Sequence, residues 1–233
     1  MPTPEPNQLL FPLPARLPEL SHNPLLFPAP QRQPKSRNVP APRIKQARLL
    51  RDLKRRQFKA LLKLENAARL IERIPKRGES LHLISNGNFA SWDIVPAILK
   101  LTRKRILRLD IATLGFSRAN VAEMAALLDA GKIAQVWLIY SCYFRSTSQL
   151  ESDYLIDTMH GKPARFAAIR NHAKLLLIEL EKGPWLAVET SANLRSCKNI
   201  EQYVVTNDRP LLEFHRSWIE DAVRDVEKHG PKK

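Results

Sequence analysis

The residues best suited to chemistry stand together in the stretch Arg170-Asn-His-Ala-Lys-Leu-Leu-Leu-Ile-Glu, where His172 and Lys174 are two positions apart. The apolar run after them predicts a buried strand over 172–180, and in a strand residues two apart point to the same face. An imidazole beside an ammonium suits phosphate chemistry, because the lysine neutralises a non-bridging oxygen and the histidine can attack phosphorus. His172 and Lys174 are therefore the candidate reactive pair.

Further polar residues follow this pair in the chain. A hairpin is expected at 181–184, and after the next apolar segment come Ser191 and Asn193, then Glu201 before a strand expected over 202–206. Each of the three has an ordinary structural alternative. Asn193 could cap a turn, Ser191 could bond the backbone, and Glu201 could pair with a surface arginine.

Taken in order, these residues resemble the signature of the phospholipase D superfamily, over about residues 80–225. That signature is His-x-Lys, an Asp five residues after the Lys, Gly-Ser-x-Asn, and a later Glu or Gln that opens a strand. The resemblance implies catalytic roles for His172, Lys174, Asn193 and Glu201, and a substrate-binding role for Ser191. Two positions depart from the pattern: Glu179 stands where the family has Asp, an acid expected to be structural, and Thr190 replaces the glycine.

The family's chemistry uses two His-x-Lys units that face one phosphorus, whereas this chain has one. His82 and His160 lack the Ser-x-Asn set that should follow, and His160 is expected in a loop at a helix end although Lys162 lies two positions on. The resemblance therefore implies a homodimer that pairs His172 with its symmetry mate. Single-motif members of this kind are commonly nucleases, and the resemblance implies no metal and no cofactor.

The elements that must position these residues alternate between strand and helix from Ser80 onward. Strands are expected over 81–85, 105–113, 134–141, 164–169, 172–180 and 202–206, and helices over 92–103, 118–130, 149–159 and 210–228. Such alternation predicts an α/β fold with a mixed or parallel sheet. We expect a phospholipase D-like layered sandwich, a mixed β-sheet flanked by helices, over residues 78–230.

Two segments precede this domain. Residues 1–43 hold 12 of the 18 prolines and predict a disordered tail, in which two similar Leu-Leu-Phe-Pro segments could dock a protein partner or could match by chance. Residues 44–77 predict a basic helix or arm. From Arg43 to Arg77 there are 13 Lys or Arg against three acids, a net charge of +10. This charge favours an arm for nucleic acid, with Lys54, Arg55 and Arg56 as substrate-binding residues, over a solvated face or a membrane-surface helix.

Bulk composition narrows the function further. The formal charge of +15 favours DNA or another polyanion as partner. Two cysteines form no disulfide framework, and neither a signal-like segment nor a spanning apolar run is seen, so we expect a cytoplasmic protein with no integral membrane association. The leading hypothesis is a metal-independent phosphodiesterase that cleaves DNA through a phosphohistidine at a site shared across a homodimer. The alternatives are a phospholipid phosphodiesterase or transferase, and a degenerate nucleic-acid-binding module.

Overall fold

A computed structural model describes residues 61–195 and 198–230, which belong to one compact unit. The predicted tail, the first part of the predicted arm and the three basic residues Lys54, Arg55 and Arg56 lie outside the described residues. Among the described residues, no helix is both long enough and apolar enough to cross a membrane.

Seven strands form one mixed sheet in the order β1-β7-β6-β5-β2-β3-β4. The pairs β2–β3 and β3–β4 are parallel, and the other four pairs are antiparallel. The expected mixed α/β sheet is thus confirmed. The strands are β1 (Ser80–Ser85), β2 (Ile106–Thr113), β3 (Val136–Ser141), β4 (Ala164–Ile169), β5 (Leu175–Leu180), β6 (Trp185–Thr190) and β7 (Glu201–Asn207).

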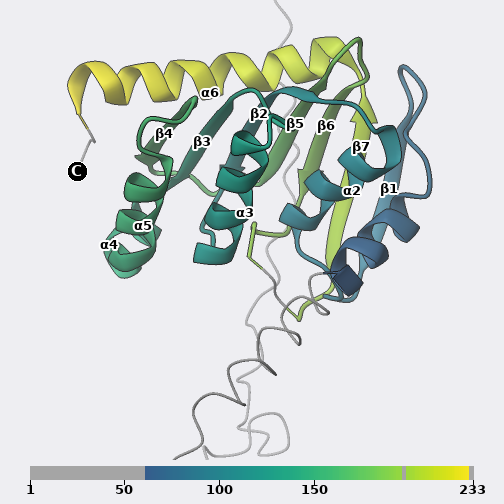
Figure 1. Cartoon of the computed structure of the whole chain (residues 1–233), viewed down its shortest axis with the longest axis horizontal. Coiled ribbons are helices and arrows are strands. Elements are labelled where there is room, and N and C mark those ends of the chain that lie inside the picture. Colours follow the sequence, from purple (N-terminus) through teal and green to yellow (C-terminus); the bar gives the residue numbers. More distant parts are fainter. Residues whose placement is uncertain (1–60, 196–197, 231–233) are drawn as a thin grey trace, which may run out of the picture. The chain divides into compact units, whose positions relative to one another are not determined.

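Helices cover both faces of this sheet (Figure 1). The long helix α6 (Arg209–His229) crosses one face, and the short 3-10 helix η1 (Ser91–Asp93) leads into α2 (Ile94–Thr102) on the other. That second face also carries α3 (Arg118–Asp129) and α5 (Gln149–Met159), and α4 (Cys142–Thr147) directly follows β3. Side-chain caps fix two helix starts, because Ser117 accepts from Asn120 N and Asp208 accepts from Leu211 N.

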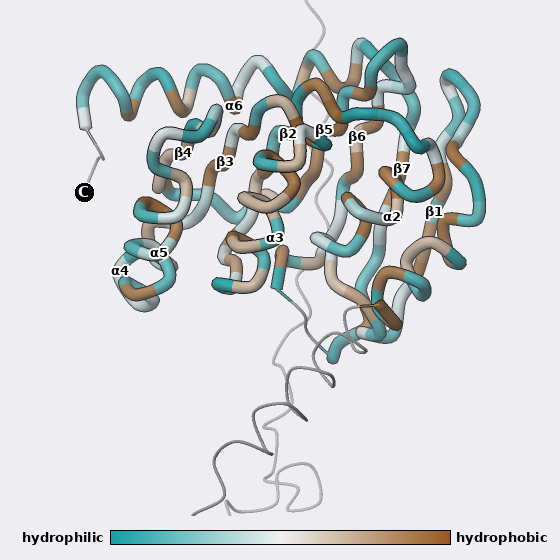
Figure 2. Tube along the Cα trace, viewed as in Figure 1, coloured by the Kyte–Doolittle hydropathy of each residue, from teal (hydrophilic) through white to brown (hydrophobic). Residues whose placement is uncertain are grey.

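Burial on the two faces follows from strand alternation. In β5, Leu176 and Ile178 belong to the core under α2 and α3, whereas Leu175 and Leu177 pack under α6. The apolar residues in Figure 2 accordingly concentrate along the inner strands. In α6, apolar residues recur at intervals among polar ones, and the apolar ones pack on the sheet. Because β5 is buried on both faces, the sequence just before it is held firmly at the sheet's end.

The described part of the predicted arm is helical from residue 61 to residue 71 and packs on the domain. Ala67 and Ile71 are fully or nearly fully buried in the main core. Farther along, Asn207 Nδ2 donates to Pro75 O at 2.8 Å, which ties the segment after this helix to the end of β7. This half of the arm is therefore also part of the folded core.

Element boundaries agree with the sequence expectations within a few residues, with two differences. The strand expected from His172 begins at Leu175, because its partner β2 ends at Thr113 and the last ladder pair is Ala112 with Leu175. The helix α4 was not expected. It is short, and its start is set by Ser141, whose hydroxyl accepts from Tyr143 N at 3.2 Å.

Candidate active site

Four neighbouring strands bring the candidate residues to one end of the sheet. The carboxyl ends of β2 and β6 lie beside the amino ends of β5 and β7, because each of these adjacent strands is antiparallel to the next. His172 and Lys174 precede β5, Ser191 and Asn193 follow β6, and Glu201 opens β7. Five of the predicted site residues are thus gathered by the sheet, across 30 residues of sequence.

The reactive pair lies in the loop just before β5, not within the strand. Lys174 Nζ is 3.2 Å from His172 Nδ1 and donates to His172 O at 2.8 Å. His172 is exposed, and Lys174 is half-buried. The two side chains are in contact, but the predicted strand geometry of residues 172–174 is wrong, because both residues precede β5.

Asn171 holds this loop against the end of β2. Its Nδ2 donates to Thr113 O at 2.9 Å, and its Oδ1 accepts from Ala173 N at 3.0 Å. These bonds replace the ladder that would have continued β5 toward His172. Asn171 was not among the predicted site residues, although its position directly before His172 is a signal that could have identified it.

Asn193 reaches the same end of β2 from the other side. Its Oδ1 accepts from Leu114 N at 3.1 Å and lies 3.5 Å from Thr113 Oγ1. The oxygen of its amide is thus used to join the loop after β6 to the loop after β2. Its Nδ2 is the part of the side chain left to act as a donor toward a substrate.

Ser191 and Glu201 are directly bonded, because the hydroxyl of Ser191 donates to Glu201 Oε2. The same hydroxyl accepts from Gln202 N at 3.1 Å, and Thr190 Oγ1 donates to Gln202 O at 2.8 Å. Thr190, which stands where the family pattern has glycine, therefore helps to lock the end of β6 onto β7. Its N–H donates to Lys174 O at 3.1 Å, which links this pair to the reactive loop.

Two features of the surroundings of Lys174 act on its pKa in opposite directions. Burial lowers the pKa of Lys174, and the nearby carboxylate of Glu201 opposes this by raising it. Burial disfavours the charged ammonium, whereas an opposite charge favours it. Glu201 is thus close enough to Lys174 to influence its charge.

Glu179 lies on the face of β5 that α6 covers and joins this strand to the helix. Arg216 Nη1 contacts Glu179 Oε2 at 2.7 Å, and Arg216 Nε contacts the fully buried Asp110 at 3.1 Å. Arg108 Nε also donates to Asp110 at 2.7 Å. The acid that replaces the family's aspartate therefore belongs to an ion network beneath α6.

An open cavity of about 590 Å³ adjoins His172. Tyr143, which is 68% exposed, and Arg170 line it together with Cys142 and Asn171. The sequence did not single out Tyr143 or Arg170, because Tyr143 stands on the unexpected helix α4. An aromatic ring and a guanidinium beside the reactive histidine offer a stacking surface and a phosphate contact.

The other histidines considered lie elsewhere. His82 is exposed on β1, and His160 caps the end of α5, as expected for a loop residue. Within residues 61–195 and 198–230, no group of three or more His, Cys, Asp or Glu side chains could hold a metal ion.

Comparison with known proteins gives matches among solved structures alone. No protein-family model and no curated protein matches the chain. Nuc from Salmonella typhimurium, a phospholipase D family member, matches with a TM-score of 0.44 and 11% identity, over 62% of this chain and 94% of that chain. TrmBL2, an archaeal chromatin protein with a novel mode of DNA binding, matches with a TM-score of 0.44 and 16% identity, over 76% and 63%.

A third match is a phosphatidylserine synthase from Haemophilus influenzae, with a TM-score of 0.42 and 16% identity, over 62% of this chain and 38% of that chain. The chain spans less than two thirds of this synthase and of TrmBL2. The solved structures that are similar to this chain thus include a phospholipase D family member.

Proposed function

We propose that this chain is a metal-independent phosphodiesterase of the phospholipase D type that cleaves nucleic acid, with DNA as the first substrate to test. The observation that carries the proposal is the contact of Lys174 Nζ with His172 Nδ1, 3.2 Å, at the sheet end that also holds Ser191, Asn193 and Glu201. A lone His-x-Lys is a weak signal. Its strength here comes from the convergence of five residues, in the order of the family signature, at one place.

The contact between the two side chains suggests the state of the free site. An ammonium can only donate, so His172 Nδ1 accepts and the proton of a neutral imidazole lies on Nε2. Once Lys174 leaves Nδ1, a ring protonated on both nitrogens can give its Nε2 proton to a leaving oxygen and become a neutral imidazole. When a substrate phosphate draws Lys174 to its own oxygens, Nδ1 is released and can carry the proton, which leaves Nε2 free to attack.

Two chains together complete the reaction. Nε2 of one His172 attacks phosphorus and forms an N–P bond, while the P–O bond to the leaving group breaks and that oxygen takes a proton from the second copy's His172. Water then attacks the phosphohistidine, gives its proton to the second copy's imidazole, and releases the first. The lysine of each copy neutralises charge on the phosphoryl oxygens. In metal-dependent phosphodiesterases a bound metal ion has this role.

Nucleic acid is the favoured substrate because of the charge distribution and the cavity at His172. The net charge of +10 over residues 43–77 includes Lys54, Arg55 and Arg56, which we assign to the phosphate backbone. Tyr143 and Arg170 in the cavity suit a base and a phosphate. A reducing, cytoplasmic setting agrees with the two cysteines of the chain.

Plasmid nicking in EDTA tests this function, with His172→Ala as the variant and His82→Ala, an exposed histidine on β1, as its matched control. We expect the wild type and His82→Ala to nick, and His172→Ala to lose at least about 10³-fold in rate while it still binds DNA. Lys174→Ala should weaken both binding and rate. Cleavage by His172→Ala at the wild-type rate would refute the assignment of the site.

Two other outcomes identify the alternatives. Release of headgroup from phosphatidylcholine vesicles, with no nicking, would show a phospholipid phosphodiesterase. DNA binding by the wild type without turnover of plasmid, oligonucleotide or bis(p-nitrophenyl) phosphate would show a degenerate binding module.

A further inference from the structure

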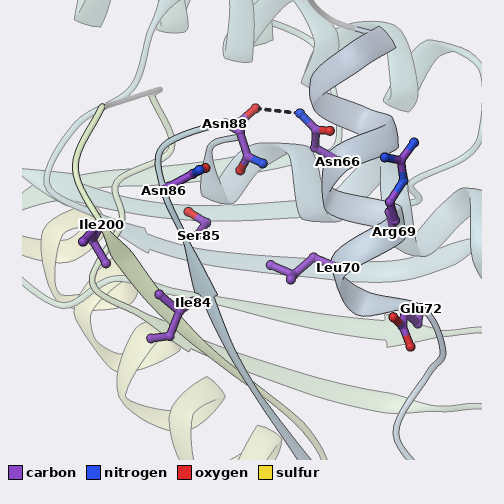
Figure 3. A pocket seen from close by; sticks show the side chains of 9 residues that line it. All are labelled: Asn66, Arg69, Leu70, Glu72, Ile84, Ser85, Asn86, Asn88 and Ile200. Carbon is purple, nitrogen blue, oxygen red and sulfur yellow. Dashed lines mark hydrogen bonds between the residues drawn. The ribbon is translucent and has the colours of Figure 1, made fainter.

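A second pocket, of about 520 Å³, lies between the 61–71 helix and the end of β1, with Ile200 before β7 also in its lining. Figure 3 shows Asn66 and Leu70 on the helix, facing Asn86 and Asn88 from the segment after β1. The volume is within the range of pockets that hold small ligands. Neither the reactive pair nor its bonded partners use these residues.

Two residues that line the pocket are direct neighbours of Glu201, the first residue of β7. Ser85, which lines the pocket, is the β-ladder partner of Glu201, and Ile200 lines the pocket one residue before Glu201. Glu201 in turn is bonded by Ser191 and influences the pKa of Lys174. A polymer bound with a phosphate at His172 and Lys174 would therefore place a neighbouring unit at this pocket.

The lining has the chemistry of a site for an uncharged, flat, hydrogen-bonding group. The amides of Asn66, Asn86 and Asn88 each offer donors and an acceptor, and the bond that Asn66 Nδ2 makes to Asn88 O is long, at 3.4 Å. Ile84 is 64% exposed and Ile200 is 76% exposed, so apolar surface faces the same space.

Charge argues against a second phosphate site here. One basic residue, Arg69, and one acidic residue, Glu72, line the pocket, so the local charge balances. A phosphate pocket would carry a clear basic excess. Asparagine amides instead match the edges of nucleobases, and apolar side chains match their faces and the sugar.

We propose, building on the proposed function, that this pocket receives one base of a single-stranded nucleic acid next to the scissile phosphate. A base in a duplex has its pairing edge occupied and both faces stacked, so it cannot present that edge to the asparagines. The pocket therefore makes the protein prefer unpaired strands and gives it a contact with the base as well as with the backbone.

Binding tests this without any need for turnover. In a His172→Asn background, the affinity for a labelled dT 12-mer is compared with that for a 12-mer of abasic deoxyribose phosphate, which has the same phosphates and no bases. We expect the dT strand to bind about tenfold more tightly. Equal affinities of the parent protein for the two strands would overturn the proposal.

Variants then locate the preference. Asn66→Ala with Asn88→Ala should bring the ratio of the two affinities close to one, and Ile200→Ser, at a largely exposed position, should lower it independently of the amides. Gln149→Ala removes an exposed amide at the start of α5 and should leave the ratio unchanged. An unchanged ratio in both pocket variants would assign base contact to another surface, such as Tyr143. Failure of the wild type to nick plasmid, with the affinity ratio intact in the His172→Asn protein, would instead count against the proposed function alone.

Discussion

Lys174 has two partners that set its charge and its position. Its Nζ lies against His172, and its pKa is lowered by burial while Glu201 raises it. A lysine that binds phosphate must stay protonated, and a depressed pKa brings its loss of charge closer to working pH. Glu201 thus opposes the loss of charge that burial favours at Lys174.

Glu201→Gln should shift the alkaline limb of the pH profile of kcat/KM to lower pH. Removal of the carboxylate removes an influence that raises the pKa of Lys174, so the lysine loses its proton at a lower pH. Lys174→Arg should move the same limb to higher pH. Bis(p-nitrophenyl) phosphate serves as substrate, and Glu213→Gln, an exposed acid on α6, is the control. A limb that stays in place or moves upward in Glu201→Gln would contradict the coupling.

Among the elements, α6 and α4 support the site from outside it. Arg216 of α6 joins Glu179 of β5 to Asp110 of β2, so the two strands on which the reactive loop rests are fixed to one helix. Burial raises the pKa of Asp110, against the lowering influence of Arg108 and Arg216. The network keeps strands β2 and β5 in one register under the helix.

Asp110→Asn should therefore destabilise the domain by about 1–3 kcal/mol, because both arginines lose a buried acceptor while Arg108 keeps Glu220 and Arg216 keeps Glu179. Urea unfolding followed by circular dichroism measures this. Glu213→Gln, which breaks the exposed pair with Arg209, should leave the midpoint almost unchanged. Equal small effects of the two substitutions would show that the buried network contributes little.

Gly115 permits the close approach of α4 that places Tyr143 at the cavity. A Cβ at Gly115 would overlap the ring of Phe144, so Gly115→Ala should cost about 1–3 kcal/mol by overpacking and lower the rate on oligonucleotides. Phe144→Leu makes room for the added methyl group. The double variant should be more stable than the sum of the single effects predicts, by about 1 kcal/mol. Strict additivity in thermal unfolding would mean that the ring and residue 115 do not compete for space.

At the scale of the whole molecule, one chain supplies half of the proposed reaction. A single His172 serves as nucleophile or as acid in a given step, and one Lys174 neutralises part of the developing charge. The proline-rich tail and the first part of the predicted basic arm lie outside the described residues, and a protein partner for the tail remains a prediction.

An equal mixture of wild type and His172→Ala, unfolded together and refolded, should retain about one quarter of the wild-type activity. Random pairing leaves that fraction of dimers with both histidines. A mixture of wild type with His82→Ala should keep full activity. Retention of one half, or sedimentation of a fully active monomer, would reject the shared site and return attention to His160.

Lys54, Arg55 and Arg56 can be tested together through salt dependence. Their replacement by glutamine should reduce the slope of log K against log salt for duplex DNA by about 2 to 3, since each neutralised phosphate contributes about 0.9. Lys100, Lys132 and Lys228 are exposed elsewhere on the domain, and their joint replacement changes the net charge equally. The same slope change in both triple variants would mean that net charge, and not the arm, governs binding.

The sequence by itself determined the elements and their order. The periodicity of residues 149–159 and 164–169 predicted a helix and a strand whose observed ends are the same, because hydrophobic repeat and local caps act within a few residues. The order of His172, Lys174, Ser191, Asn193 and Glu201 also suggested one phosphate site. These are properties of neighbouring residues, and no long-range contact is needed to read them.

Tertiary structure alone decided how those residues meet. The placement of β5 between β6 and β2 sets Ser191 and Asn193 beside the reactive loop. Because β2 ends at Thr113, β5 begins only at Leu175, after Lys174. Tyr143 and the asparagine-lined pocket likewise depend on α4 and on the packing of the 61–71 helix against β1. Strand order, ladder ends and cavities arise from pairing between distant segments, whose geometry is not contained in any local pattern.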